Sequence, residues 1–338
     1  MTAPDLPLPR GPLSAAVLDA LRDGAPGSAA LDDLHPVDAD PFGDDLQLAL
    51  YCCYELHYRG FAGVDEDLEW DPALLALRGR AEDVFERALR DAVPPSDGSD
   101  LGEVLDALLV EPVSGRGPSW HIRETGEPWQ VREYVVHRSL YHLKEADPQA
   151  MVIARLDGPP KAALVTVQHD EYGAGDPARM HSRLFADMMV ALDLDPSYGR
   201  YLDAAPAETL AEVNLMSLCG LHRRLRGALV GQFATVELTS SPGSDRLVRG
   251  LRRLGLPEAA VEFYAEHIEA DAVHEQLLRR GVVAPLVAAE PALAADVVFG
   301  VRASTFLADR LGEHLLACWE AGRSSLRDGA APGLSPAA

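Results

Sequence analysis

The chain has 338 residues, 47% of them hydrophobic and 25% charged, so it is long enough to bury a substantial core and has the composition of a folded protein. Its formal net charge of −23 at pH 7 disfavours binding to nucleic acid and to an anionic membrane surface, because both carry charge of the same sign. Small molecules, metal ions and other proteins remain as partners.

The N-terminus and the cysteines indicate where the protein resides. The first residues lack the basic segment, apolar core and cleavage site of a secretory signal, and we find no apolar run long enough to cross a bilayer. The four cysteines form no CxxC pair, and Cys52 and Cys53 are neighbours that do not readily bridge each other. These features predict a cytoplasmic protein with reduced, mostly buried thiols and no membrane attachment.

The N-terminal third of the chain divides into a loose segment, residues 1–45, and a helical portion, residues 46–115. Pro, Gly and Asp are frequent in the first, which predicts loops and one short helix over 13–22. Apolar residues recur at helical spacing in the second, and these helices could either add to a larger bundle or pair two chains into a homodimer. Three helices are predicted there, at 46–61, 72–93 and 101–110.

Glu55 and His57 lie near the end of the first of these helices, two residues apart. That spacing places them on opposed faces of a helix, so they cannot form a joint ligand pair. We interpret them as a structural pair joined by a hydrogen bond.

The rest of the chain begins after a Gly- and Pro-rich segment, residues 113–128. We expect a helical bundle over 116–325 and a disordered tail over 326–338. Strand-like alternation is almost absent from the sequence. The fold class is therefore predicted to be all-α, of bundle type.

Helix starts and stops in the bundle are signalled by Pro, Gly and Asp. One helix begins with Asp176 as its N-cap and Pro177 as its first residue, one or two apolar helices close at Pro242-Gly243, and the last helix ends at Gly322. The predicted helical stretches are 129–146, 161–173, 177–194, 207–241, 257–280 and 293–321.

The most informative stretch is the helix predicted over 257–280, which carries His267, Asp271 and His274. Residues at i, i+4 and i+7 share one helix face, so two imidazoles and a carboxylate point the same way. That set suits non-heme iron, manganese or zinc, and one helix can supply half of a dinuclear site. The competing interpretation is a solvated polar face, because further acids surround the three residues: Glu262, Glu266, Glu269 and Glu275.

Three positions upstream could complete such a site. Glu237 lies in the apolar run VGQFATVEL, where a buried carboxylate has to be paired, protonated or bound to metal. Glu171 and His181 flank the break GAGDP; on an unbroken helix they would be about 15 Å apart, too far to reach one pair of metals. The break therefore predicts that the chain folds back. As alternatives, His181 could be solvent-exposed at a helix start and Glu171 a surface acid beside Asp170.

Several short sequence segments, considered together and in this order, are informative. They are ELHYRGF, LYHLKEADP, DEYGAGDPARMH, the isolated Glu237, HIEADAVH and LGEHLLACWEAGR, and they span about residues 45–323. The set resembles the iron-containing redox enzymes of the heme-oxygenase-like diiron oxidase and oxygenase superfamily. The resemblance implies a seven-helix bundle, here with an additional N-terminal helical portion, and it implies two iron ions, O₂ as co-substrate and no heme.

The resemblance also assigns iron ligands by position. Glu145, in HLKEADP, falls where members that oxygenate amine nitrogen have an extra carboxylate; an ion pair with Arg138 or Lys144 is the alternative for it. We infer that Glu237 bridges the two irons. The six core ligands implied are Glu171, His181, Glu237, His267, Asp271 and His274.

The implied activity is O₂ activation to oxidise a small metabolite, with electrons that could come from an external donor. Because of Glu145, we favour N-oxygenation of an amine or amino-acid-like substrate. Oxidative decarboxylation or C–C cleavage of a fatty or amino acid by the same site is the alternative. A rival of another class is a non-catalytic helical protein that binds a metabolite or a partner.

Two further rivals belong to the same fold. A heme-binding protein would need a proximal His on an early helix, whereas the imidazoles here cluster on a late one. A pyrimidine-hydrolysing enzyme would need a nucleophilic cysteine in its cavity, and Cys219 is the candidate.

Overall fold

The computed structural model describes residues 3–24, 31, 34–111 and 114–327. These residues form helices and no strand, which confirms the all-α, heme-oxygenase-like fold class. The helices are α1 (Pro12–Asp23), α3 (Asp44–Glu55), α4 (Pro72–Ala92), α5 (Leu101–Leu108), α6 (Pro118–Glu124), α7 (Pro128–His142), α8 (Asp147–Ala150), α9 (Gly158–Glu171), α10 (His181–Ala191), α11 (Ala207–Leu221), α12 (Arg226–Arg253), α13 (Glu262–Gln276), α14 (Ala284–Ala289) and α15 (Ala294–Glu320).

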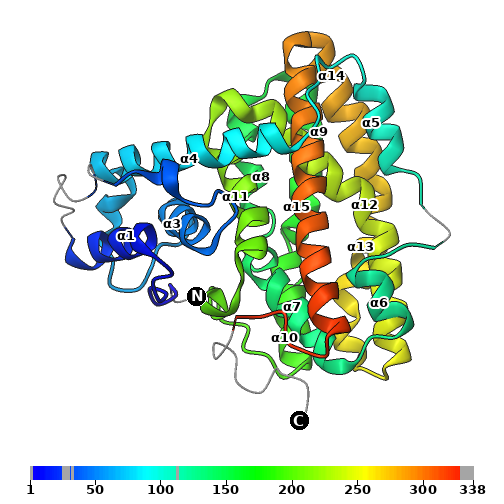
Figure 1. Cartoon of the computed structure of the whole chain (residues 1–338). Helices are drawn as coiled ribbons and strands as arrows, with labels where there is room; N and C mark the ends of the chain where they lie inside the picture. The colour runs from blue at the N-terminus through cyan, green and yellow to red at the C-terminus, as the bar shows by residue number, and fades with distance from the viewer. Residues whose placement is uncertain (1–2, 25–30, 32–33, 112–113, 328–338) are drawn as a thin grey trace.

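The long helix α12 runs beside both α13 and α15 (Figure 1). Two glycines bring the backbones of α12 and α15 into direct contact. A Cβ on Gly231 would lie 2.0 Å from the carbonyl oxygen of Val297, and a Cβ on Gly300 would lie 2.0 Å from that of Ala228. Since no side chain fits at either glycine, the two helices pack at the closest approach that backbones allow.

The segment Pro291–Glu320, which includes α15, is by length and composition able to cross a membrane, and the sequence analysis did not recognise it. Half of its most apolar window is buried inside the protein. Together with the glycine contacts to α12, this burial indicates that one face of α15 packs against the rest of the helical bundle.

The N-terminal helices α1, α3 and α4 lie together on one side of the bundle (Figure 1). One continuous hydrophobic cluster includes Leu18 and Phe85 of this portion and Leu229 and Val297 of the bundle. The predicted boundary near residue 116 therefore does not coincide with a break in the core. The short helix predicted over 13–22 is confirmed as α1, but its buried face makes the described part of the segment packed rather than loose.

Several predicted helix limits were wrong; for example, α3 ends at Glu55 rather than at residue 61, and α7 ends at His142 rather than at residue 146. Helix α12 continues through Pro242 to Arg253, although an interior proline costs about 3 kcal/mol in a helix. Its packing against α6, α13 and α15 outweighs that cost. Helix α10 begins at His181 rather than at Pro177, and Asp176 instead accepts a hydrogen bond from the backbone N–H of Ala178 in the preceding loop.

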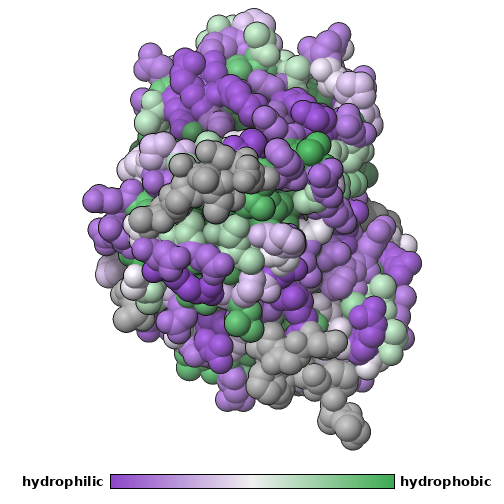
Figure 2. Space-filling model, turned by 60° about the vertical axis from the view of Figure 1, so that its left-hand side comes forward, coloured by the Kyte–Doolittle hydropathy of each residue, from purple (hydrophilic) through white to green (hydrophobic). Residues whose placement is uncertain are grey.

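The C-terminal end of the described chain is packed against the bundle. Leu326 is buried, and the backbone N–H of Arg327 donates to the carbonyl of Ala204 at 2.9 Å. Residues 326 and 327 are thus ordered, contrary to the prediction, and the rest of the predicted tail, 328–338, lies outside the described residues. Polar side chains dominate the face shown in Figure 2, with smaller apolar areas scattered among them, as an acidic globular surface requires.

Candidate metal centre

Helix α13 turns its three candidate ligands inward. His267, Asp271 and His274 are 6%, 1% and 1% exposed, whereas Glu262 and Glu269 on the same helix are exposed. The helical spacing of four and seven therefore defines a buried face. The alternative of a solvated face is excluded for these three side chains.

The break between α9 and α10 folds the chain back as predicted. Gly173, Ala174 and Gly175 all have positive φ, at 73°, 53° and 89°. A Cβ on Gly173 would lie 2.6 Å from the backbone nitrogen of Met180, so only glycine lets the loop close this tightly. As a result, Nδ1 of His181 lies 2.9 Å from Oε2 of Glu171, and both side chains are buried.

All seven predicted residues meet in the interior, in two groups whose ligand atoms lie within 4.8 Å of one another. Bonds of about 2.1 Å to a central ion place ligand atoms up to about 4.2 Å apart, so both groups are near the size of a metal site. Glu171 belongs to both groups, and Glu237, which was predicted to bridge the two irons, belongs to only one. The groups are Glu145, Glu171, His181 and His267, and Glu171, Glu237, Asp271 and His274.

Many polar atoms of this cluster are buried without a hydrogen-bond partner. Buried polar groups in proteins are normally satisfied, so a concentration of unsatisfied ones indicates that something else binds there. The donor set, carboxylate oxygen and imidazole nitrogen, is the one that iron accepts. The unsatisfied atoms are Oε2 of Glu145, Nε2 of His267, and Oδ1 and Oδ2 of Asp271.

Two of the histidines are oriented by a contact to their other ring nitrogen. Nδ1 of His267 lies 2.7 Å from the carbonyl oxygen of Phe263 and donates to it, which leaves Nε2 as the ligand atom. Nδ1 of His274 faces the cluster, and its Nε2 lies 3.3 Å from Asp170. Such outer contacts fix the tautomer and the ring orientation of metal-binding histidines.

The sequence analysis had treated Asp170 only as a neighbouring surface acid. Its side chain is 43% exposed, yet it lies on the far side of His274 from the cluster. The sequence did contain an indication of this role. Asp170 and Glu171 are adjacent at the end of α9, so when Glu171 points into the cluster, Asp170 lies next to the cluster.

The pKa values show what the cluster does when no metal is bound. Burial raises the pKa of Glu145 to about 8, and burial with the charge of Asp271 raises that of Glu237 well above its ordinary value. Burial opposes protonation of the imidazoles, but Glu171 raises the pKa of His181 to about 9. These groups retain protons that a metal ion would displace, so metal affinity depends on pH.

Glu145 joins the cluster from the turn that follows α7. The alternative ion pairs predicted for it are not formed: Arg138 pairs with Glu212 at 2.7 Å, and Lys144 pairs with Glu55 at 2.9 Å. Instead, Oε1 of Glu145 lies 2.9 Å from Nδ1 of His142, which leaves Oε2 free to bind. The sequence analysis missed His142, whose role is to position this carboxylate.

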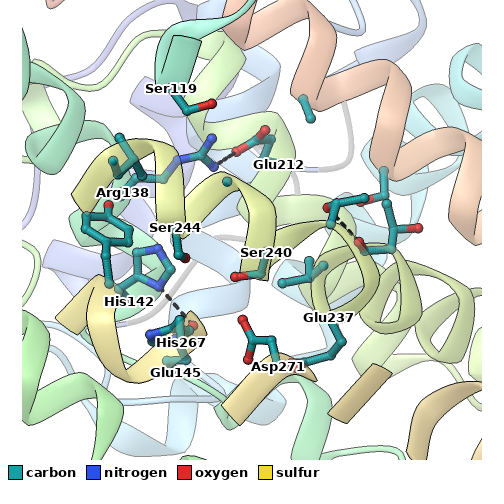
Figure 3. Close-up of a pocket in the computed structure, with 18 of the residues that line it drawn as sticks. Ser119, Arg138, His142, Glu145, Glu212, Glu237, Ser240, Ser244, His267 and Asp271 are labelled. Carbon is teal, nitrogen blue, oxygen red and sulfur yellow. Dashed lines mark hydrogen bonds and ion pairs between the residues drawn. The ribbon is translucent and has the colours of Figure 1, made fainter. Parts of the chain in front are cut away.

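A cavity of about 240 Å³ adjoins the cluster. Glu145, His267 and Asp271 lie at one end of the cavity, and Arg138 and Glu212 lie at the other (Figure 3). The hydroxyl-bearing residues of its wall between the two ends include Ser240 and Ser244. The candidate metal centre is thus accessible to a small molecule.

The cysteine rival is not supported by the geometry. Cys219 is fully buried within the hydrophobic core and does not line the cavity. Burial raises the pKa of its thiol, so the reactive thiolate is disfavoured. All four cysteines are free and buried, as predicted.

Fold and site together define an all-α protein with a buried cluster of histidines and carboxylates that could hold metal. A family model described as iron-containing redox enzyme matches residues 132–309, more than half of the chain and all seven cluster residues. The chain belongs to this family, whose members share the heme-oxygenase-like bundle, and is an iron-dependent oxidoreductase. No curated protein matches the chain.

Proposed function

We propose that the chain binds two iron ions through the seven cluster residues and uses O₂, without heme, to oxidise a small metabolite. The observation that carries this proposal is the position of Glu171. Its Oε2 lies 2.9 Å from Nδ1 of His181 in one group, and its Oε1 lies 3.5 Å from Nδ1 of His274 in the other. A carboxylate whose two oxygens face two separate candidate ligand groups supports a site for two metal ions rather than one.

Charge supports two divalent ions rather than one. The cluster contains four carboxylates and three imidazoles in the interior. Four ionised carboxylates would be strongly destabilising there without compensation. Two ferrous ions balance their charge, with the imidazoles neutral as metal binding requires.

The chemistry that an iron pair would supply is activation of O₂ with two electrons: one oxygen atom enters the substrate, which gives up two further electrons, the other oxygen leaves as water with two protons, and an external reductant restores the two electrons of the irons. The chain itself provides the surroundings. The buried rings of Phe185 and Phe263 pack against His142, and Phe263 also contacts His267 at 4.3 Å between ring centroids. These rings exclude water from the cavity end that carries the ligands.

For the substrate we favour an amine or an amino-acid-like compound that is oxygenated at nitrogen. Glu145 supports this preference, because it lies in the cluster as the additional carboxylate that the resemblance associates with N-oxygenation. Oxidative decarboxylation or C–C cleavage of a fatty or amino acid by the same site is the alternative. The cytoplasmic location, the external electron donor and a homodimer stay predictions.

The proposal is tested by measuring the metal content of the protein and then its visible absorption spectrum. Protein reconstituted with Fe(II) without O₂ is expected to bind two ions per chain, and O₂ is expected to produce a transient visible absorption. One ion per chain at saturation would contradict the two-iron proposal. Oxygen consumption measured with amines, amino acids and medium-chain fatty acids then tests the substrate class, and activity with fatty acids alone would reject the preference for nitrogen.

The same experiment separates the non-catalytic rival. A protein that only binds a metabolite would show no oxygen consumption with any of the three compound classes, even when fully loaded with iron. A stable metal content without O₂ reactivity would favour that rival.

A further inference from the structure

The end of the cavity opposite the metal centre carries a pair of opposite charges. Nη1 of Arg138, on α7, donates to Oε2 of Glu212, on α11, at 2.7 Å. Both residues line the cavity, and both side chains are mostly buried, at 28% and 12% exposed. Although burial opposes its charge, Glu212 raises the pKa of Arg138 above its ordinary value, so the guanidinium stays cationic.

Two hydrogen-bond donors beside this ion pair are unused. Nε of Arg138 and the hydroxyl of Tyr264 are buried without a hydrogen-bond partner, and Tyr264 also lines the cavity. A pair that served only to join α7 to α11 would not require unsatisfied donors beside it. Two unused donors next to a cation are suited to an anion such as a carboxylate, which arginine commonly binds through two N–H groups.

We propose that Arg138, Tyr264 and Glu212 form a binding site for the α-carboxylate and α-ammonium groups of an amino acid. Arg138 and Tyr264 donate to the carboxylate, and Glu212 accepts from the ammonium group. This inference rests on the proposed function and narrows its substrate class. It also orients the substrate, because the site lies at the far end of the cavity from Glu145, His267 and Asp271 (Figure 3).

The orientation determines which part of the substrate is oxidised. Arg138 and Glu212 lie at one end of the cavity and the candidate ligand Glu145 lies at the other (Figure 3). The α-amino group therefore stays away from the metals, and the end of the side chain reaches them. The cavity of about 240 Å³ holds the volume of about eight water molecules, enough for an amino acid with a side chain of several bonds.

The test measures binding rather than turnover. The full-length protein, loaded with Zn(II) so that no oxidation occurs, is titrated calorimetrically with each of the protein amino acids, and with the decarboxylated amine and deaminated acid of any that binds. At least one amino acid is expected to bind on the order of tenfold or more tightly than both analogues, about 1.4 kcal/mol. Equal binding of the amine, or binding of no amino acid, would overturn the proposal.

Variants locate the site within the cavity. Glu212→Gln, which keeps the side-chain shape, and Arg138→Gln are each expected to weaken amino acid binding on the order of tenfold or more, because each removes one charged partner. Tyr264→Phe is expected to weaken it by a smaller factor, and it covers the case in which the Arg138 variant does not fold. Arg116→Gln is the matched control, because Arg116 forms an exposed pair with Glu320.

Metal content separates this proposal from the proposed function. All three cavity variants are expected to bind as much metal as the unmodified chain, because none of the substituted residues belongs to the ligand groups. If the protein binds one metal ion or none but the variants still weaken amino acid binding, only the two-iron proposal fails. Unchanged amino acid affinity in the Arg138 and Glu212 variants would overturn the binding site itself.

Discussion

Two clusters of buried charge lie next to each other in the chain and differ in one respect. In the first, Nζ of Lys144 donates to Glu55 at 2.9 Å, the hydroxyl of Tyr198 donates to the other carboxylate oxygen at 2.6 Å, and the ammonium lies 4.1 Å from the centre of the Tyr58 ring. Its charges are paired and its carboxylate is satisfied. The second begins at the next residue, Glu145, and contains an excess of carboxylates with unsatisfied atoms.

This difference indicates that the first cluster has a structural role and the second a role in binding. A paired and satisfied buried cluster holds elements together, and this one joins α3 of the N-terminal portion to the turn that carries Glu145. A cluster with surplus carboxylates has to hold protons or bind a cation, and its unsatisfied atoms favour the cation. Burial alone would not have distinguished them, because Glu55 and Glu145 are both almost fully buried.

The largest expected effect comes from the carboxylate common to both ligand groups. Glu171→Gln removes a charged ligand from each group, so we expect metal affinity to fall by more than about 100-fold, since even outer contacts of ligands cost 10- to 100-fold. Metal content after dialysis against a fixed free concentration measures this. Glu266→Gln, on the partly exposed side of α13, is the control and should bind two ions. If the Glu171 variant still bound two ions with unchanged affinity, Glu171 would not be a ligand common to both groups.

The satisfied cluster should respond in stability rather than in metal binding. Lys144→Met leaves the charge of Glu55 buried without its partner, and we expect the free energy of unfolding to fall by about 3–5 kcal/mol in urea titrations. The double variant Glu55→Gln, Lys144→Met should regain most of that loss, because no charge remains unpaired. Metal content per folded chain should not change. A loss of metal in the double variant would show that the two clusters are not separate.

An intermediate effect is expected from Asp170, which contacts the metal centre only through His274. Asp170→Asn removes the charge that orients this imidazole and should lower metal affinity by about 10- to 100-fold. Competition with a chelator measures the change, and Asp187→Asn, at an exposed acid of α10, is the control. Equal affinity of both variants would remove Asp170 from the site.

The smallest effect on stability is expected from His137, a buried histidine whose ring nitrogens both have hydrogen-bond partners and are therefore not available as metal ligands. Both ring nitrogens of His137 have partners, Thr209 at 2.6 Å and Ser325 at 2.9 Å, and burial lowers its pKa to about 3. The folded protein keeps it neutral, whereas the unfolded chain gains a proton below its ordinary pKa of about 6.5. Stability should therefore fall as the pH decreases from about 6.5, by about 2 kcal/mol at pH 5.

This loss is measured by urea unfolding of the metal-free protein at several pH values. The variant His137→Gln should be less stable at every pH. Its free energy of unfolding should change less steeply with pH, by a slope that corresponds to nearly one proton fewer taken up on unfolding. The same slope in the variant and the unmodified chain would mean that other groups cause the acid sensitivity.

The sequence predicted features that depend on local geometry. The spacing of His267, Asp271 and His274 follows from the period of one helix, and the GAGDP break follows from residues that adopt positive φ, so both are correct in the structure. The predicted pair of Glu55 and His57 was wrong, because Glu55 instead binds Lys144 and Tyr198, while His57 contacts Glu69 at 2.8 Å.

By itself, the sequence determined most of the helices and the buried face of α13 that carries three candidate ligands, because these depend on residues within a few turns of one another. Only the tertiary structure decided that Glu171 is the shared carboxylate, that α12 continues through Pro242, and that Arg138 and Glu212 meet at the end of the cavity. The physical reason is that each of these outcomes depends on how separate helices pack, and packing can outweigh a local preference such as that of proline.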